Sequence, residues 1–206
     1  MLLEKITRMT ELLLVNSPDH TAMVTIATRD GRPVRVRHMR PEDGVLLERM
    51  FYHLSSETRY RRFFMPLDHI DPARVRQEAQ RLAQIHPKRE LALIALAKES
   101  GSDECIAVTR YGRIPNTLHA CEGSIVVRDD YQRSGVGRQL FDLLIQSAMA
   151  RGMQHMSLLT HADNAAMIAL VQRLGLPYHG RHSVDLYEMD VQLTDGNKPF
   201  FPFTAP

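Results

Sequence analysis

The sequence of 206 residues predicts an α/β protein, in which strands and helices alternate along the chain. The main observation is a strand–turn–helix unit over residues 122–151. Its β-branched run at 125–127 ends in a polar turn with two glycines, and apolar residues then recur at helical spacing. A second unit has a strand over 156–160 and a helix over 164–175. Near the N-terminus, Asp30-Gly31 is a dipeptide typical of β-hairpins.

The composition is that of an ordinary globular protein with one sizeable core, since 44% of the residues are hydrophobic and 24% are charged. A net charge of +2 is too small to indicate a nucleic-acid partner. No apolar run approaches the ~18 residues that a membrane span needs. The two cysteines, Cys105 and Cys121, form no Cys-x-x-Cys motif, which indicates reduced thiols and a cytoplasmic protein. The histidines lack metal-ligand spacing, so no metal is predicted.

The N-terminal elements are an amphipathic helix and the hairpin. The helix, over 2–15, is interpreted as a packing element or as the contact of a possible homodimer, not as a membrane element. The hairpin strands are expected over 22–28 and 34–38. A helix follows Glu42-Asp43, whose negative charges suit a helix N-terminus.

The other elements are predicted from caps and apolar runs. Asp71 and Pro72 are typical of the N-cap and first position of a helix, which is expected to reach Gln84. Four further strands are predicted: 91–97, 105–111, one around Tyr178, and 184–191.

The segment 54–64 interleaves basic and aromatic residues. Such a pattern can stack nucleic-acid bases, but an amphipathic helix with core aromatics and solvated arginines is the preferred interpretation.

The turn over 132–138 has the features of an anion site. The first N–H groups of a helix lack partners inside the helix, and the helix dipole adds positive charge there. Gly135 and Gly137 let an anion approach the backbone closely, and Arg133 and Arg138 add charge. The lysine of a P-loop and the third small residue of a Rossmann turn are both absent.

Gln132-x-x-Gly135-x-Gly137 resembles motif A of the GNAT N-acetyltransferase superfamily, whose loop holds the pyrophosphate of acetyl-CoA. Residues 164–176 resemble motif B of the same family, with Val171 in place of its tyrosine. The resemblance implies the GNAT acyl-CoA N-acyltransferase fold, an α/β (α+β) architecture with a mixed, mostly antiparallel sheet flanked by helices. It also implies acetyl-CoA as co-substrate. The cofactor-binding residues it implies are Val126, Val127, Gln132, Arg133, Ser134, Gly135, Val136, Gly137, Arg138 and Asn164. Asn164 has the alternative role of helix N-cap.

The segment 54–64 and the strand around Glu122 resemble the GNAT domain of bacterial Pat-type protein lysine acetyltransferases. This resemblance implies a protein lysine as the acceptor. It also suggests that three arginines of the segment steer an acidic partner, and these are Arg59, Arg61 and Arg62.

Glu122 is the candidate catalytic residue. A lysine amine is almost wholly protonated at neutral pH, so its acetylation benefits from a general base. Glu122 begins the strand that leads to the cofactor turn, and burial there would raise its pKa. The Pat resemblance implies the same role, although a solvent-facing strand residue is the alternative. The backbone N–H of Val126 or Val127 is the expected donor to the thioester oxygen.

The general acid is left open, because the family's motif B tyrosine is absent. Tyr178, Tyr187 or water are the candidates. An acyl-enzyme on Cys121 with His119 or His161 is a disfavoured alternative, because adjacent strand residues face opposite ways.

The function predicted is direct acetyl transfer from acetyl-CoA to a primary amine, with a protein lysine as the preferred acceptor. The alternatives are a small-molecule amine as acceptor, or a non-catalytic acyl-CoA-binding regulatory module. The predicted organisation has an N-terminal helix and extra hairpin strand (1–32), the N-acetyltransferase domain (33–194) and a C-terminal tail (195–206).

Overall fold

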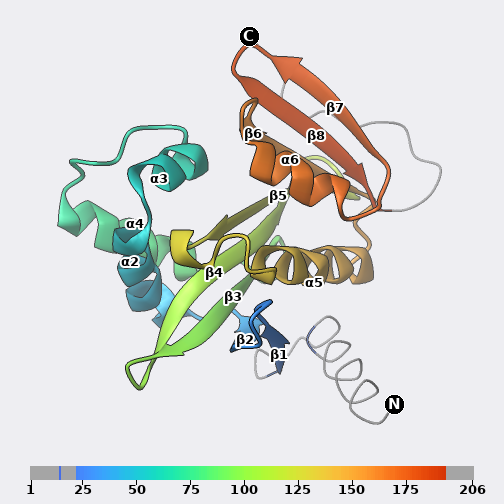
Figure 1. Cartoon of the computed structure of the whole chain (residues 1–206). Helices are drawn as coiled ribbons and strands as arrows, with labels where there is room; N and C mark the ends of the chain where they lie inside the picture. Colours follow the sequence, from blue (N-terminus) through green and yellow to red (C-terminus); the bar gives the residue numbers. More distant parts are fainter. Residues whose placement is uncertain (1–13, 15–21, 194–206) are drawn as a thin grey trace.

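The computed structural model describes Leu14 and residues 22–193. One eight-stranded sheet runs through it in the order β1-β2-β3-β4-β5-β6-β8-β7 (Figure 1). The strands are β1 (Met23–Ala27), β2 (Pro33–His38), β3 (Glu90–Glu99), β4 (Ser102–Arg113), β5 (Ala120–Val127), β6 (His155–His161), β7 (Tyr178–Ser183) and β8 (Leu186–Gln192). Every neighbouring pair is antiparallel except β5–β6. The predicted mixed, mostly antiparallel sheet is therefore confirmed.

Helices cover both faces of this sheet (Figure 1). On one face, α2 (Gly44–His53) and α4 (Pro72–Ala83) bury apolar residues against β3 and β4, whereas α5 (Val136–Ala150) packs on the other face. Two shorter helices, α3 (Ser56–Phe63) and α6 (Ala165–Gln172), lie near the C-terminal half of the sheet. No helix in the described part of the chain is both long and apolar enough to cross a membrane.

The predicted hairpin forms the first edge of the sheet. β1 and β2 pair in register from Met23↔Arg37 to Ala27↔Pro33, and Gly31 in the turn has a φ of +85°, which glycine adopts without steric cost. The predicted helix over 2–15 lies outside the described residues, apart from Leu14. The tail over 195–206 lies outside them entirely.

The sheet opens between β5 and β6. Their parallel pairing covers only Ala120↔His155, Cys121↔Met156 and Glu122↔Ser157. Beyond Glu122 the two strands part, and the second half of β5 keeps only β4 as a neighbour. This opening is where the candidate site lies.

Candidate functional site

A groove of about 880 Å³ occupies the opening between β5 and β6 and extends over α3, α5 and α6. Most of the predicted site residues lie along it. These are Glu122, Val126, Val127, Gln132, Arg133, Gly135, Gly137, Arg138 and Asn164. Ser134 and Val136 do not line the groove. The Ser134 hydroxyl donates to the Tyr131 carbonyl, and Val136 is fully buried, so both shape the turn from behind.

The two glycines of the turn have separate structural reasons. Gly135 is the N-cap of α5 with a φ of +89°, a conformation that strains any residue with a side chain. Gly137 permits a close approach instead, because a Cβ built on it would lie 3.3 Å from Cγ2 of Val127. The first turn of α5 therefore sits directly against the end of β5, with its N–H groups at the groove.

The groove is positively charged. Six arginines line it against two carboxylates, Glu122 and Asp142. The arginines are Arg29, Arg61, Arg62, Arg133, Arg138 and Arg173. Acetyl-CoA fits this arrangement, because its phosphates need cations and free N–H groups, whereas its acyl-pantetheine arm is extended and narrow.

The free edge of β5 supplies backbone groups to the groove. Arg128 directly follows β5, and its N–H donates to the carbonyl of Ile106 in β4. Because successive N–H groups of a strand point to opposite sides, the N–H of Val127 points away from β4, and that of Val126 points toward it. By the same alternation Ile125, which the sequence analysis did not single out, also turns its N–H toward the groove. The geometry thus favours Val127 over Val126 as a donor.

Glu122 lies where the two strands separate, with its side chain exposed to the groove. Burial by the groove walls raises the pKa of this carboxyl, and the positive charge of Arg62 partly opposes the increase. Arg62 itself donates to the Ser124 hydroxyl at 3.2 Å. Arg62 and Glu122 are therefore oppositely charged neighbours at one end of the groove, without a direct ion pair between them.

The three arginines of α3 have different surroundings. Arg59 stacks over the Phe51 ring, 4.7 Å from its centroid, and does not line the groove. Arg61 pairs with Glu57 at 2.7 Å and lies 3.8 Å from Asp163. Only Arg62 lies beside Glu122. The sequence analysis gave the three arginines the same role, because the neighbours that distinguish them come from distant segments of the chain.

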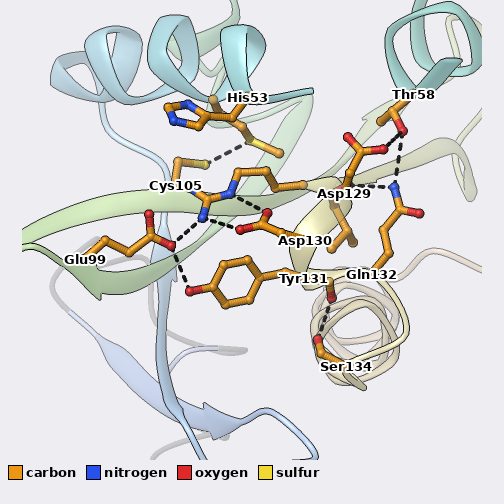
Figure 2. A network of polar contacts seen from close by, with 12 residues as sticks. His53, Thr58, Glu99, Cys105, Asp129, Asp130, Tyr131, Gln132 and Ser134 are labelled. Atoms are coloured by element: carbon orange, nitrogen blue, oxygen red, sulfur yellow. Dashed lines mark hydrogen bonds and ion pairs between the residues drawn. The ribbon is translucent and has the colours of Figure 1, made fainter. Parts of the chain in front are cut away.

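Polar contacts join α3 to the turn before α5 (Figure 2). The Asp129 carboxylate accepts from the Ser55 N–H, the Ser55 hydroxyl and the Thr58 hydroxyl. The Gln132 amide then donates to the Thr58 hydroxyl and to the Val127 carbonyl, at 3.2 Å each. Gln132 therefore ties the turn to α3 and to the edge of β5.

The alternative chemical roles find little support in the geometry. Cys121 is fully buried, and burial raises the pKa of its thiol to about 12, which opposes nucleophilic attack. The His161 ring stacks between Tyr60 and Phe64, with centroids 4.9 and 4.8 Å away. The His119 ring contacts the Gly152 carbonyl.

The candidate general acids also lie apart from the groove. Tyr178 and Tyr187 do not line it. Tyr131 does line the groove, but its hydroxyl donates to Glu99 at 2.8 Å.

Asn164, a predicted cofactor-binding residue, has its side chain engaged in the start of α6. The side chain accepts from the Met167 N–H and donates to Thr160, so it acts as the N-cap of α6.

The comparisons with known proteins agree with this geometry. The profile of the family described as "Acetyltransferase (GNAT) family" matches residues 47–176. "Acetyltransferase PA5475" of Pseudomonas aeruginosa is 32% identical over 146 residues, which cover 71% of this chain and 76% of the relative. "Acetyltransferase Pat" of Mycolicibacterium smegmatis is 29% identical over 182 residues, 87% of this chain and 52% of Pat, so the chain spans about half the length of that relative.

A solved structure of the GNAT domain of S. lividans PAT has the same fold. Its TM-score is 0.70 at 23% identity, and the match covers 82% of this chain and 96% of that domain.

Proposed function

The chain belongs to the GNAT family of acetyltransferases, and from this premise we propose that it acetylates a protein lysine, with Glu122 as the general base. As an N-acetyltransferase it uses acetyl-CoA as its donor. The observation that carries the proposal is the position of Glu122, exposed to the groove at the point where β5 and β6 part. Its raised pKa brings the carboxylate closer to the basicity that proton abstraction needs.

Glu122 accepts a proton from the ammonium form of the acceptor, directly or through one water. The free amine then attacks the thioester carbon, and a free N–H of β5 donates to the carbonyl oxygen as negative charge develops there. The Val127 N–H is the favoured donor, because it faces the groove. As the C–S bond breaks and the amide forms, the attacking nitrogen loses its second proton to solvent, and the departing thiolate takes up a proton from solvent. A thiol of pKa near 8.5 leaves readily without a general acid.

The groove wall supports a polypeptide acceptor. The side chains of α3 and its C-cap beside the groove include exposed aromatics, since Tyr60 is 47% exposed and Phe64 is 40% exposed. A lysine side chain reaching Glu122 past this rim would bring its own backbone and neighbours against these rings. The similarity to Pat is consistent with such an acceptor. We place the protein in the cytoplasm, because both cysteines are free thiols.

A small amine with an acidic group is the second candidate, and Arg62 favours it. Within the described residues, the half-buried Arg62 donates to the Ser124 hydroxyl and has no carboxylate at ion-pair distance. An acceptor carboxylate on Arg62 would bring the neighbouring amine toward Glu122.

The test measures CoA release from acetyl-CoA with the purified protein and separate acceptor pools: lysine-containing peptides, amino acids and polyamines. The Glu122→Gln variant is expected to lower kcat by about 10²- to 10⁴-fold with unchanged acetyl-CoA binding. Glu42→Gln makes the same chemical change at an exposed position outside the groove, and should leave turnover unaltered. Turnover restricted to amino acids would favour a small amine over a protein lysine as the acceptor. Binding without turnover in every pool would indicate a regulatory acyl-CoA-binding module.

A further inference from the structure

The β1–β2 hairpin is attached to the turn that begins α5. The Arg29 N–H donates to the Ser134 carbonyl at 2.8 Å, and the Gln139 amide donates to the Ala27 carbonyl at 2.8 Å. These bonds join residues that are more than 100 positions apart in the sequence. The hairpin is therefore fixed against the turn by backbone groups of Ala27 and Arg29, independently of the Arg29 side chain.

The Arg29 side chain extends over the glycine of that turn. A Cβ built on Gly135 would lie 3.4 Å from Cγ of Arg29 and 3.9 Å from its Nε. Arg29 also lines the groove, although it precedes the predicted acetyltransferase domain in the sequence. The absence of a side chain at Gly135 thus leaves room for an arginine from another element.

The guanidinium of Arg29 is available to a ligand. Its side chain is exposed, and no carboxylate of the described residues lies within ion-pair distance of it. Arg32, on the same turn, is also exposed, but its guanidinium already has partners. It pairs with Asp30 at 3.0 Å and lies over the Tyr131 ring, 4.8 Å from its centroid, and Arg32 itself does not line the groove.

We propose that Arg29 binds a phosphate group of acyl-CoA, which makes the β1–β2 hairpin part of the cofactor site. The proposal rests on acyl-CoA occupying this groove with its phosphates at the α5 turn. The guanidinium donates in a planar fork that matches phosphate oxygens, and the backbone bonds of the hairpin hold it there before the ligand arrives. The anionic groups of the ligand are its pyrophosphate and its 3′-phosphate, and Arg29 is placed to contact one of them.

The experiment compares the dissociation constants of three ligands: CoA, dephospho-CoA, which lacks the 3′-phosphate, and pantetheine, which lacks every phosphate. Calorimetry serves for the first two and ligand-detected NMR for the third. The variants are Arg29→Ala, Arg29→Lys, which keeps the charge, and Arg32→Ala, which makes the same change in net charge on the same turn. Because binding is measured, the result does not depend on any acceptor or on Glu122.

Arg29→Ala is expected to weaken CoA binding by about tenfold or more, with Arg29→Lys intermediate and Arg32→Ala like the wild type. Equal losses for CoA and dephospho-CoA would assign Arg29 to the pyrophosphate, whereas a loss for CoA alone would assign it to the 3′-phosphate. Pantetheine binding should not change. CoA binding of wild-type strength in Arg29→Ala, or an equal loss for pantetheine, would overturn the proposal.

Discussion

Asp129 and Ser55 lie 74 residues apart in the sequence, yet the Asp129 carboxylate accepts from both the backbone N–H and the hydroxyl of Ser55, at 2.8 and 2.7 Å. Ser55 is also the N-cap of α3, and its hydroxyl accepts from the Thr58 N–H. None of the residues of α3 is buried. The position of this helix therefore depends on polar contacts with the turn before α5 more than on a packed apolar face.

Asp129→Asn should loosen α3, because an amide NH₂ would face donors where the carboxylate accepts. We expect a loss of about 1–3 kcal/mol in the free energy of unfolding, together with a larger rise in the KM of the acceptor than in the dissociation constant of acetyl-CoA. Chemical denaturation and steady-state kinetics measure the two effects. Asp185→Asn, in the exposed turn between β7 and β8, is the matched control.

The pH dependence of that loss has a definite sign. Burial raises the pKa of Asp129, but the hydrogen bonds from Ser55 and Thr58 outweigh it, so the pKa lies below its usual value. A lowered pKa in the folded state contributes stability above the unfolded pKa, about 3.9, and this contribution disappears as the pH falls through the folded pKa. The stability difference between wild type and Asp129→Asn should therefore shrink at acid pH. A constant difference from pH 7 to pH 2 would contradict it.

Glu122→Gln should be more stable than the wild type at neutral pH. Burial raises the pKa of Glu122, so the folded protein binds this proton more tightly than the unfolded chain does. The stability of the wild type then falls as the pH rises through the window between the unfolded and the folded pKa, and glutamine avoids that loss. Thermal unfolding at pH 4 and pH 7 measures the difference, which should be larger at pH 7. A lower midpoint for the variant at pH 7 would refute the expectation.

Arg62→Met should move the acid limb of the kcat/KM profile to higher pH. The charge of Arg62 lowers the pKa of Glu122 against the effect of burial, so removing it lets that pKa rise further. Glu122 would then become an active base only at higher pH. Arg59→Met, on the same helix but stacked on Phe51, is the control and should keep the wild-type limb. Identical acid limbs in the wild type and both variants would show that the ionisation seen in the profile is not that of Glu122.

Gly123→Ala should destabilise the protein where β5 and β6 part. A Cβ on Gly123 would lie 2.6 Å from Sδ of Met156 and 2.9 Å from Cδ2 of Leu158, so these two fully buried side chains would have to shift within the core. Overpacking of this kind costs about 1–3 kcal/mol. Gly112→Ala is the matched control, because Gly112 is a strand glycine of β4 with no atom within 4 Å of its built Cβ. Equal stability of the two variants would show that the side chains around Gly123 rearrange without a loss of stability.

Most elements could be predicted from local sequence signals. Asp71 is the N-cap of α4 and accepts from the Ala73 N–H, as its position before Pro72 indicated. The Asp30-Gly31 dipeptide predicted the hairpin that β1 and β2 form. The helix expected over 164–175 is shorter in the structure: α6 ends at Gln172, and Gly175 follows with a φ of +72°. Helix ends depend on the last few hydrogen bonds, which apolar periodicity does not specify.

The sequence by itself determined the glycine turn before α5 and the position of Glu122 in the strand that leads to it, because each depends on neighbours within a few positions. Glycine freedom, helix N–H groups and the start of a strand are local properties. Only the tertiary structure decided that Arg29 lies over Gly135, that Asp129 holds Ser55, and that Arg62 rather than Arg59 faces Glu122. These contacts join segments far apart in the chain, and their partners are brought together by sheet order and packing, which a one-dimensional pattern does not encode.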